Sequence, residues 1–445
     1  MATRGARSSQ TGRETIARHG RLRSPHPILG LLAMLGITAL VLVVSVTGVA
    51  AFSVWNAASA IADNAVVLDG DDSIPPSLGA IEGGVNLLLV GTDSCEGQDV
   101  ALFPRCANDD SPGERNDVTM LVHISDSPRR VTVVSIPRDM LVDIPACAQE
   151  DGGESSPMWG EMINASYFYG GLGCTARTVE QLTGESIQFA AAIRWTGVIH
   201  MSDAIGGVDV CVAGDISDEH TGLSLTAGQH TLQGVQALQF LRIRHGIGDG
   251  SDLGRISNQQ QFMSSMVRKL QSDAVLANPS VLLNLATTAM SQVTQGQLVL
   301  SSGLTNPRLM VQIAMAVKDV AYEDIVFVQY PTYYRARVGT EGSDVLPVTS
   351  AADVLFEALR NNQPLTLTGE ASQGYGVEVT GEAAQPTPSA SATPDAEPGS
   401  DAEPDASANP DPAVTEPAAP EERVELPSDI AGQTAAQVTC TQPQS

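Results

Sequence analysis

The fold is decided by the stretch Val85-Asn86-Leu87-Leu88-Leu89-Val90-Gly91-Thr92-Asp93-Ser94. Its first six residues are almost all apolar, which indicates a strand buried on both faces. Gly91 to Ser94 follow as a polar segment at the end of this strand, where α/β sheets commonly place ligand-binding loops. Asp93 is therefore either a turn residue or a residue of a site.

Further along the chain, the apolar runs 118–124 and 131–136 also predict buried strands. Amphipathic segments with apolar residues at helical spacing follow at about 163–183, 196–205, 255–273 and 305–317. With 445 residues, 42% of them apolar, the chain is long enough for a large core. Strands mixed with helices predict a layered α/β domain over 84–365.

Residues 28–54 contain no ionisable side chain and are longer than the roughly 20 residues needed to cross a membrane, so we expect a transmembrane helix. A cleaved signal peptide is the alternative, with a cleavage site near Ala57-Ala58-Ser59-Ala60. The tail 1–27 is rich in arginine, which places the N-terminus in the cytoplasm and the later residues outside. The protein is thus expected at the cell membrane as a single-pass protein.

Two polar segments flank the predicted domain. Residues 55–83 form a connector that carries Pro75-Pro76. Residues 372–445 are acidic and rich in proline and alanine, so they would bury too little apolar surface to fold, and we predict a disordered tail. The formal charge of −27 and the absence of a basic run after the anchor disfavour a nucleic-acid partner.

The six cysteines suit an oxidising location, and the absence of a CxxC motif argues against a zinc site. Six cysteines allow fifteen pairings. We expect Cys95 to pair with Cys106 on proximity alone. The other two expected pairs, Cys147 with Cys174 and Cys211 with Cys440, are guesses, of which the second would tie the end of the chain to the domain.

Asp117 is the next candidate after Asp93, in Arg115-Asn116-Asp117 just before the strand at 118. If Asp117 meets Asp93 across adjacent strands, the two carboxylates need a cation. Mg²⁺ suits one or two carboxylates together with substrate phosphate oxygens, and Mn²⁺ would serve the same ligands. The alternative is a surface ion pair between Arg115 and Asp117, which would contribute little.

Arginines mark three more positions. Arg138 follows a strand end in Ser135-Ile136-Pro137-Arg138-Asp139, where it is either a site residue or the partner of Asp139 in a local salt bridge. The alternation in Phe240-Leu241-Arg242-Ile243-Arg244-His245 predicts a strand with Arg242 and Arg244 on one face. Paired guanidinium groups in a cleft bind phosphate oxygens, so these arginines predict a polyanion site.

The third position opens the helix expected over 255–273. Asp252 is a plausible N-cap that would then need no further role. Arg255 and Gln259 are four residues apart and lie on one helical face, near a helix N-terminus that favours anions. Together with the carboxylates, these residues outline a metal and pyrophosphate site.

Six segments, in this order and spacing, resemble the LytR-CpsA-Psr family: Gly91-Thr92-Asp93-Ser94, Arg115-Asn116-Asp117, Ser135-Ile136-Pro137-Arg138-Asp139, Ile163-Asn164-Ala165 with Tyr169-Gly170-Gly171, Gly206-Gly207-Val208-Asp209-Val210, and 242–261. The resemblance covers about 85–275. It implies an α-β-α layered domain with a central mixed sheet on one transmembrane helix, and an apolar tunnel for a polyprenyl tail.

The resemblance also implies roles for individual residues. Asp93 and Asp117 would hold Mg²⁺, and Asp252 matches an acidic position that assists proton transfer. The residues that would grip the pyrophosphate are Arg115, Arg138, Arg242, Arg244, Arg255 and Gln259. Two features depart from the family pattern: Cys95 follows Ser94, with an insertion before Arg115, and Asn258 stands where the family often has arginine.

The implied activity is a phosphotransferase that moves a glycopolymer from a polyprenyl pyrophosphate carrier to a peptidoglycan hydroxyl, the muramic acid 6-hydroxyl, during cell wall assembly. The alternatives are a non-catalytic regulator that binds polyprenyl intermediates and a polyprenyl pyrophosphate phosphatase. The scarcity of lysine beside arginine, alanine and glycine suggests an actinobacterium.

Overall fold

The computed structural model describes residues 65–68, 84–107, 113–149, 152–272, 275, 278–335, 344–385 and 423–444. The predicted tail 1–27, the predicted transmembrane helix 28–54, most of the connector 55–83 and the segment 386–422 lie outside these residues. Among the helices of the described residues, none combines the length and apolar character that crossing a membrane requires.

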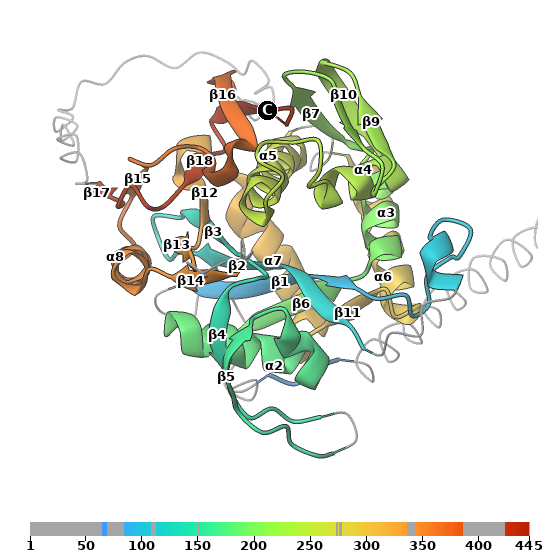
Figure 1. Ribbon diagram of the computed structural model, residues 1–445, viewed down its shortest axis with the longest axis vertical. Coiled ribbons are helices and arrows are strands. Elements are labelled where there is room, and N and C mark those ends of the chain that lie inside the picture. The colour runs from blue at the N-terminus through green and yellow to red at the C-terminus, as the bar shows by residue number, and fades with distance from the viewer. Residues whose placement is uncertain are drawn as a thin grey trace, which may run out of the picture. The chain divides into compact units, whose positions relative to one another are not determined.

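A seven-stranded mixed sheet forms the centre of the domain, in the order β11-β6-β1-β2-β3-β12-β18 (Figure 1). The predicted strands are three antiparallel neighbours in it. Parallel pairs flank them on both sides, β1 with β6 and β3 with β12. The strand bounds are β1 Val85–Asp93, β2 Arg115–Ile124, β3 Val131–Ile136, β6 Phe189–Ile193, β11 Leu298–Leu300, β12 Ile325–Gln329 and β18 Gly432–Thr434.

Helices cover both faces of this sheet, because its strands alternate two apolar faces. Leu88 and Val90 point into a core shared with α2 (Ala165–Thr183) and α8 (Thr349–Arg360). Leu87 and Leu89 point the other way, toward α5 (Asp252–Gln271) and α7 (Pro307–Lys318). Helix α6 (Pro279–Thr294) packs on that second face as well. The predicted α-β-α layers, mixed sheet and helices are confirmed.

A second sheet has the order β10-β7-β19-β16, and it packs against α5. Its strands are β7 Val208–Val212, β10 Gly228–Leu232, β16 Val377–Glu382 and β19 Gln437–Thr441, and α3 (Trp195–Ala204) and α4 (Gly234–Arg242) are neighbours in the same part of the fold. The remaining strands pair in twos: β4 Leu141–Ile144 with β5 Met158–Met162, β8 Ile216–Asp218 with β9 Leu223–Leu225, β13 Thr332–Tyr334 with β14 Val345–Pro347, and β15 Leu365–Thr366 with β17 Val424–Glu425.

The predicted domain end at 365 and the predicted disorder from 372 onward are wrong for 372–385 and 423–444. These residues form β16 to β19 and the short helix η6 (Gln373–Tyr375). Two of their apolar side chains, Leu426 and Ile430, are fully buried in the main core. The average composition of 372–445 does not reveal these strands. A few apolar residues and sheet hydrogen bonds are enough to order a segment when a folded domain already offers a sheet edge.

All three expected disulfides are present. Cys95–Cys106 closes a short loop after β1, which contains the short helix η3 (Pro104–Ala107). Cys147–Cys174 joins the segment after β4 to α2. Cys211–Cys440 joins β7 to β19, where the two cysteines are register partners 229 residues apart in sequence. The last pair therefore fixes the end of the chain to the domain.

Candidate phosphate-binding site

An irregularity in β2 aims Asp117 into the site. The register between β1 and β2 shifts after Gly91, so that Gly91 faces Val118 whereas Thr92 faces Asn116. Asp117 is the extra residue of this bulge, and bulges commonly redirect a side chain. Regular alternation would have turned Asp117 toward α2. Instead Asn116 faces that helix and accepts a hydrogen bond from the Tyr167 amide at 3.3 Å.

Asp117 lies at the centre of a group of arginines. Arg138 Nη1 donates to Asp117 Oδ1 at 2.7 Å, and Arg255 Nη2 donates to the Asp117 carbonyl at 2.9 Å. Burial raises the pKa of the Asp117 carboxyl, but the positive charges, first that of Arg138 and then that of Arg255, outweigh it and hold the pKa below its ordinary value. Asp117 is thus an ionised carboxylate inside a positive cluster.

Asp252 and Asp139 complete the cluster on its inner side. Asp252 Oδ1 lies 2.6 Å from Arg255 Nη2 and 3.4 Å from Arg138 Nε, yet neither Asp252 oxygen accepts a hydrogen bond of good angle. Asp139 also contacts Arg138, at 3.4 Å, so the local salt bridge considered from sequence exists beside the closer contact to Asp117. Burial, followed by the charge of Asp252, raises the pKa of the Asp139 carboxyl.

The N-cap role considered for Asp252 is wrong. Ser251 caps α5, since its side chain accepts a hydrogen bond from the Gly254 amide at 3.2 Å. Asp252 is the first helical residue, and its carboxylate is turned toward the arginines instead. A carboxylate in the first turn of a helix is also favoured by the helix dipole.

The predicted strand around Arg242 and Arg244 is wrong as well. Arg242 is the last residue of α4, and Ile243 and Arg244 follow in an irregular segment. The alternating pattern came from a helix end, where Phe240 and Ile243 are both fully buried at a spacing of three. The Arg242 guanidinium stacks 4.2 Å from the ring centre of Trp195, a residue that sequence reasoning had not selected.

Arg244 nevertheless reaches the same region. Together with Asp139, Asp252 and Tyr334 it lines a small cavity of about 90 Å³ beside the cluster. Its Nε atom is buried without a hydrogen-bond partner. An unpartnered guanidinium nitrogen suits an anionic ligand, because burying such a donor unsatisfied costs free energy.

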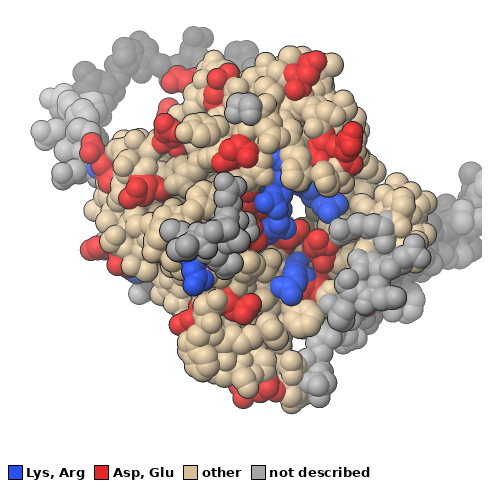
Figure 2. Space-filling model, in the orientation of Figure 1, with Lys and Arg blue, Asp and Glu red and all other residues tan. Residues whose placement is uncertain are grey.

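Asp93 and Arg115 lie at the outer end of the site. They are register partners at the ends of β1 and β2. The Arg115 guanidinium lies 5.7 Å from the ring centre of Phe168. Figure 2 shows charged side chains of both signs gathered around a hollow near the middle of one face of the domain. The structure therefore brings the ends of β1, β2 and β3 together with α4 and α5.

A family model described as the LytR_cpsA_psr family matches residues 53–354, more than half of the 445 residues. The chain belongs to the LytR_cpsA_psr family. All the predicted site residues, from Asp93 to Gln259, fall inside the matched range.

Individual relatives agree with this membership. The chain is 32% identical over 231 residues to the probable cell wall biosynthesis protein LcpB of Corynebacterium glutamicum, a match that covers 51% of each protein. It is 28% identical over 158 residues to the polyisoprenyl-teichoic acid–peptidoglycan teichoic acid transferase TagU of Enterococcus faecalis, covering 36% of this chain and 48% of that protein. The matches thus span about half the length of these relatives.

A solved structure of a LytR-Csp2A-Psr enzyme from Actinomyces oris is also similar, with 22% identity and a TM-score of 0.44. The similarity covers 62% of this chain and 90% of that one.

Two residues on α5 behave differently from the family expectation. Gln259 is buried, and its side-chain amide donates to the Leu241 carbonyl at 2.9 Å, so it supports α4 from within. Asn258, which stands where the family often has arginine, donates to the Phe240 carbonyl at 2.8 Å and accepts a hydrogen bond from Thr441. Both residues therefore hydrogen-bond α5 to α4, and Asn258 also links α5 to β19 through Thr441.

Proposed function

We propose that this LytR_cpsA_psr protein is a phosphotransferase that moves a glycopolymer from a polyprenyl pyrophosphate carrier to a peptidoglycan hydroxyl. The observation that carries the proposal is the gathering of Arg138, Arg242 and Arg255 around an ionised Asp117, with Arg244 beside the neighbouring Asp139, at the ends of three strands. Planar guanidinium groups bind phosphate oxygens in pairs, and a cluster of them stabilises the charge of a pyrophosphate.

In the proposed reaction, the acceptor hydroxyl oxygen bonds to the phosphorus that carries the glycopolymer. The bond from this phosphorus to the bridging oxygen breaks, and polyprenyl phosphate leaves with the electron pair. Arginines held in place before the reaction stabilise the charge on the phosphoryl oxygens and on the leaving group.

The proton of the acceptor hydroxyl passes to a base. Asp117 is a weak base, because its arginine neighbours lower its pKa. Asp252, at the acidic position that the family pattern links to proton transfer, is the second candidate, and it too is paired with an arginine, Arg255. A general base contributes about 10²- to 10⁴-fold, so the electrostatic groups carry the larger part of the rate.

Asp93 and Asp117 fit a hard divalent cation such as Mg²⁺ only together with substrate oxygens. Within the described residues, no three histidine, cysteine, aspartate or glutamate side chains are arranged to hold a metal. Arginines already face Asp117, so phosphate oxygens and water would supply the remaining ligands. When bound, the cation would withdraw charge from the phosphoryl oxygens.

The polyprenyl tail would lie on the α5 side of the sheet. Leu87, Leu89 and Val118 project from this face toward Met263 and Val267 of α5, and all five remain partly exposed although they pack against a core. An isoprenoid chain would bury such side chains. Because Asp93 follows Leu87 and Leu89 at the strand period of two, a lipid on this face leads directly to the arginine cluster.

The test uses the full chain reconstituted in lipid nanodiscs with a synthetic polyprenyl pyrophosphate glycan, and it measures polyprenyl phosphate by mass spectrometry. We expect turnover that requires Mg²⁺, and a loss of about 10²- to 10³-fold in Asp93→Ala and in Arg242→Ala. Arg360→Ala, which breaks an ion pair with Glu185 away from the site, is the matched control.

Adding a peptidoglycan fragment separates transfer from hydrolysis, because transfer yields a glycan linked to the fragment. Tight carrier binding without turnover, even with acceptor present, would instead support a carrier-binding regulator. Turnover that persists after chelation of divalent cations would remove Mg²⁺ from the mechanism.

A further inference from the structure

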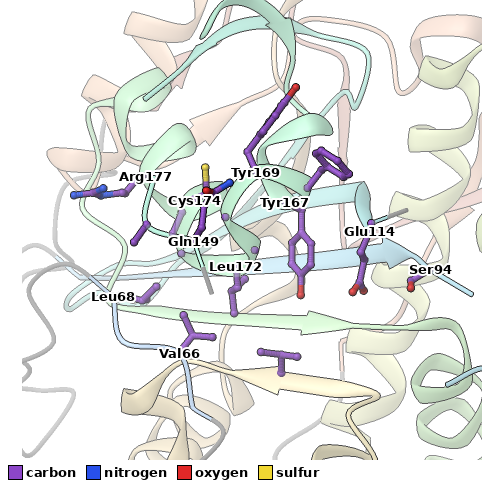
Figure 3. A pocket seen from close by; sticks show the side chains of 18 of the residues that line it. Val66, Leu68, Ser94, Glu114, Gln149, Tyr167, Tyr169, Leu172, Cys174 and Arg177 are labelled. Carbon is purple, nitrogen blue, oxygen red and sulfur yellow. The ribbon is translucent and has the colours of Figure 1, made fainter. Parts of the chain in front are cut away.

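A second cavity, of about 960 Å³, lies on the opposite face of the sheet from the arginine cluster. It runs between α2 and the edge of the sheet, from Ser94 and Glu114 at one end to Gln149 and Arg177 at the other (Figure 3). Its volume is at the upper end of the roughly 300–1,000 Å³ typical of ligand pockets. We call it the α2 cleft.

The α2 cleft meets the phosphate site at the strand ends. Ser94 directly follows Asp93, and Glu114 directly precedes Arg115. Ser94 and Glu114 line the cleft just outside the two strands, so the same two chain segments supply residues to both sites. Phe168 also lines the cleft while its ring lies beneath the Arg115 guanidinium. A molecule in the cleft would therefore end next to the reacting phosphate.

The lining mixes polar and apolar groups. Figure 3 shows Tyr167 and Glu114 with their oxygen atoms directed the same way, and Leu172 near Val66 beside them. The charged side chains around the cleft are three glutamates and two arginines: Glu96, Glu114, Glu180, Arg177 and Arg194. An isoprenoid chain prefers a lining without charges, and a polyanion prefers an excess of positive charge, so neither the lipid nor the pyrophosphate suits this cleft.

Hydrogen bonds and two disulfides hold the walls of the cleft in place. Arg194 donates hydrogen bonds to both carboxylate oxygens of Glu114, among them Nη2 to Oε2 at 2.6 Å and Nε to Oε1 at 3.0 Å. Both Cys95–Cys106 and Cys147–Cys174 contribute cysteines to the lining. A site that is already ordered loses little conformational entropy on binding.

Helix α2 is unwound where it borders the cleft. Gly170 and Gly171 have non-helical backbone angles, and Gly171 has a φ of +60°. A Cβ at Gly170 would lie 2.8 Å from the Ala148 carbonyl oxygen, so only glycine fits against the disulfide there. Gly170 and Gly171 line the cleft at this turn, and backbone N–H and C=O groups that border a pocket recognise hydroxyl and amide groups.

We infer that the α2 cleft binds the acceptor, an N-acetylated saccharide strand of the wall. Such a strand presents hydroxyl and acetamido edges to polar side chains and C–H faces to apolar ones, and its N-acetylglucosamine units are uncharged. The identity of this saccharide rests on the proposed function, whereas the presence of a saccharide site does not.

The experiment measures binding of a soluble N-acetylglucosamine–N-acetylmuramic acid tetrasaccharide to the full chain in nanodiscs, by calorimetry and without donor. Gly173→Phe adds a ring beside the cleft at a position where a Cβ meets only Val66, at 3.7 Å. Gln149→Ala removes an exposed polar group at the far end. We expect the dissociation constant to rise by at least about tenfold in Gly173→Phe and by about threefold in Gln149→Ala.

Gln229→Ala, at an exposed glutamine of β10 outside the cleft, should bind as the unchanged protein does. Hydrolysis of the donor without acceptor should stay within about twofold in all three variants, because the arginine cluster is untouched. Unchanged saccharide binding in both cleft variants would overturn the inference, and so would loss of donor binding in them. Absence of donor turnover in the unchanged protein would count against the proposed function alone.

Discussion

The family-matched part of the chain and the strands near its C-terminus contribute to the site in different ways. Residues 53–354 carry every charged group of the cluster. The later residues carry none of these charges, but they hydrogen-bond to the segment between Arg244 and Asp252. The Gly248 amide donates to the Gln442 carbonyl at 3.1 Å, and the Asp249 amide donates to the Gly374 carbonyl at 3.0 Å. The charges and their positioning are therefore encoded in separate regions.

The same comparison holds at α5. Gln261 donates to the Thr439 carbonyl at 2.8 Å and accepts a hydrogen bond from the Thr441 hydroxyl at 2.6 Å. Thr441 also donates to Asn258. The helix that carries Arg255 is thus bonded to β19, and Cys211–Cys440 locks β19 to the domain. Four predictions test this division between charge and positioning.

The largest effect is expected from removing the long-range disulfide. In the chain-entropy model, the stabilisation by a cross-link grows with loop length, so Cys211→Ser with Cys440→Ser should lower the free energy of unfolding by about 5 kcal/mol. Cys95→Ser with Cys106→Ser, across only 11 residues, should lower it by about 3 kcal/mol. Denaturant unfolding of both double variants measures the difference. Equal losses would show that β19 is held without its disulfide.

The next effect concerns charge. Arg138→Ala removes the closest partner of Asp117 and a neighbour of Asp252, and we expect turnover to fall by about 10²- to 10³-fold. Arg268→Ala is the matched control, because Arg268 bonds to the Ala435 carbonyl of the C-terminal region and not to the cluster. It should affect stability more than turnover. If Arg268→Ala instead lowered turnover more than stability, charge and positioning would not be separate functions of the two regions.

The third prediction concerns acid stability of the family-matched core. His123 in β2 is buried, and burial lowers its pKa to about 4. Between that value and the ordinary 6.5, only the unfolded chain binds the proton, so stability falls as the pH drops from about 6.5 to about 4. The loss amounts to about 3 kcal/mol. His123→Gln, which preserves a partner for Asn86, should flatten this part of the pH profile of unfolding.

The smallest effect is expected from Thr441→Val, which keeps the shape of the side chain but removes the hydroxyl bonded to Asn258 and Gln261. Buried partners left unsatisfied cost about 1–3 kcal/mol, so the free energy of unfolding should fall by that amount. Hydrogen exchange of the α5 amides should rise in the same variant. An unchanged exchange rate of the α5 amides would show that β19 does not help to position α5.

Much of the fold could be predicted from the sequence, because its main signals are local. Apolar runs identified β1, β2 and β3, and helical spacing identified α2, α3, α5 and α7. Arg242 was assigned to the wrong element, since four alternating residues fit a strand or a helix end equally well. The C-terminal strands were missed because their pairing partners lie far away in the sequence.

The sequence by itself determined which charged residues this protein has, in what order they occur, and which family it belongs to. The order of the motifs and the spacing of the apolar residues can be read from the sequence alone. Only the tertiary structure decided which contacts these residues make. The bulge in β2 directs Asp117 toward Arg138, Asp252 turns toward Arg255, and Thr441 hydrogen-bonds to Asn258. These are contacts between distant segments, and packing selects them.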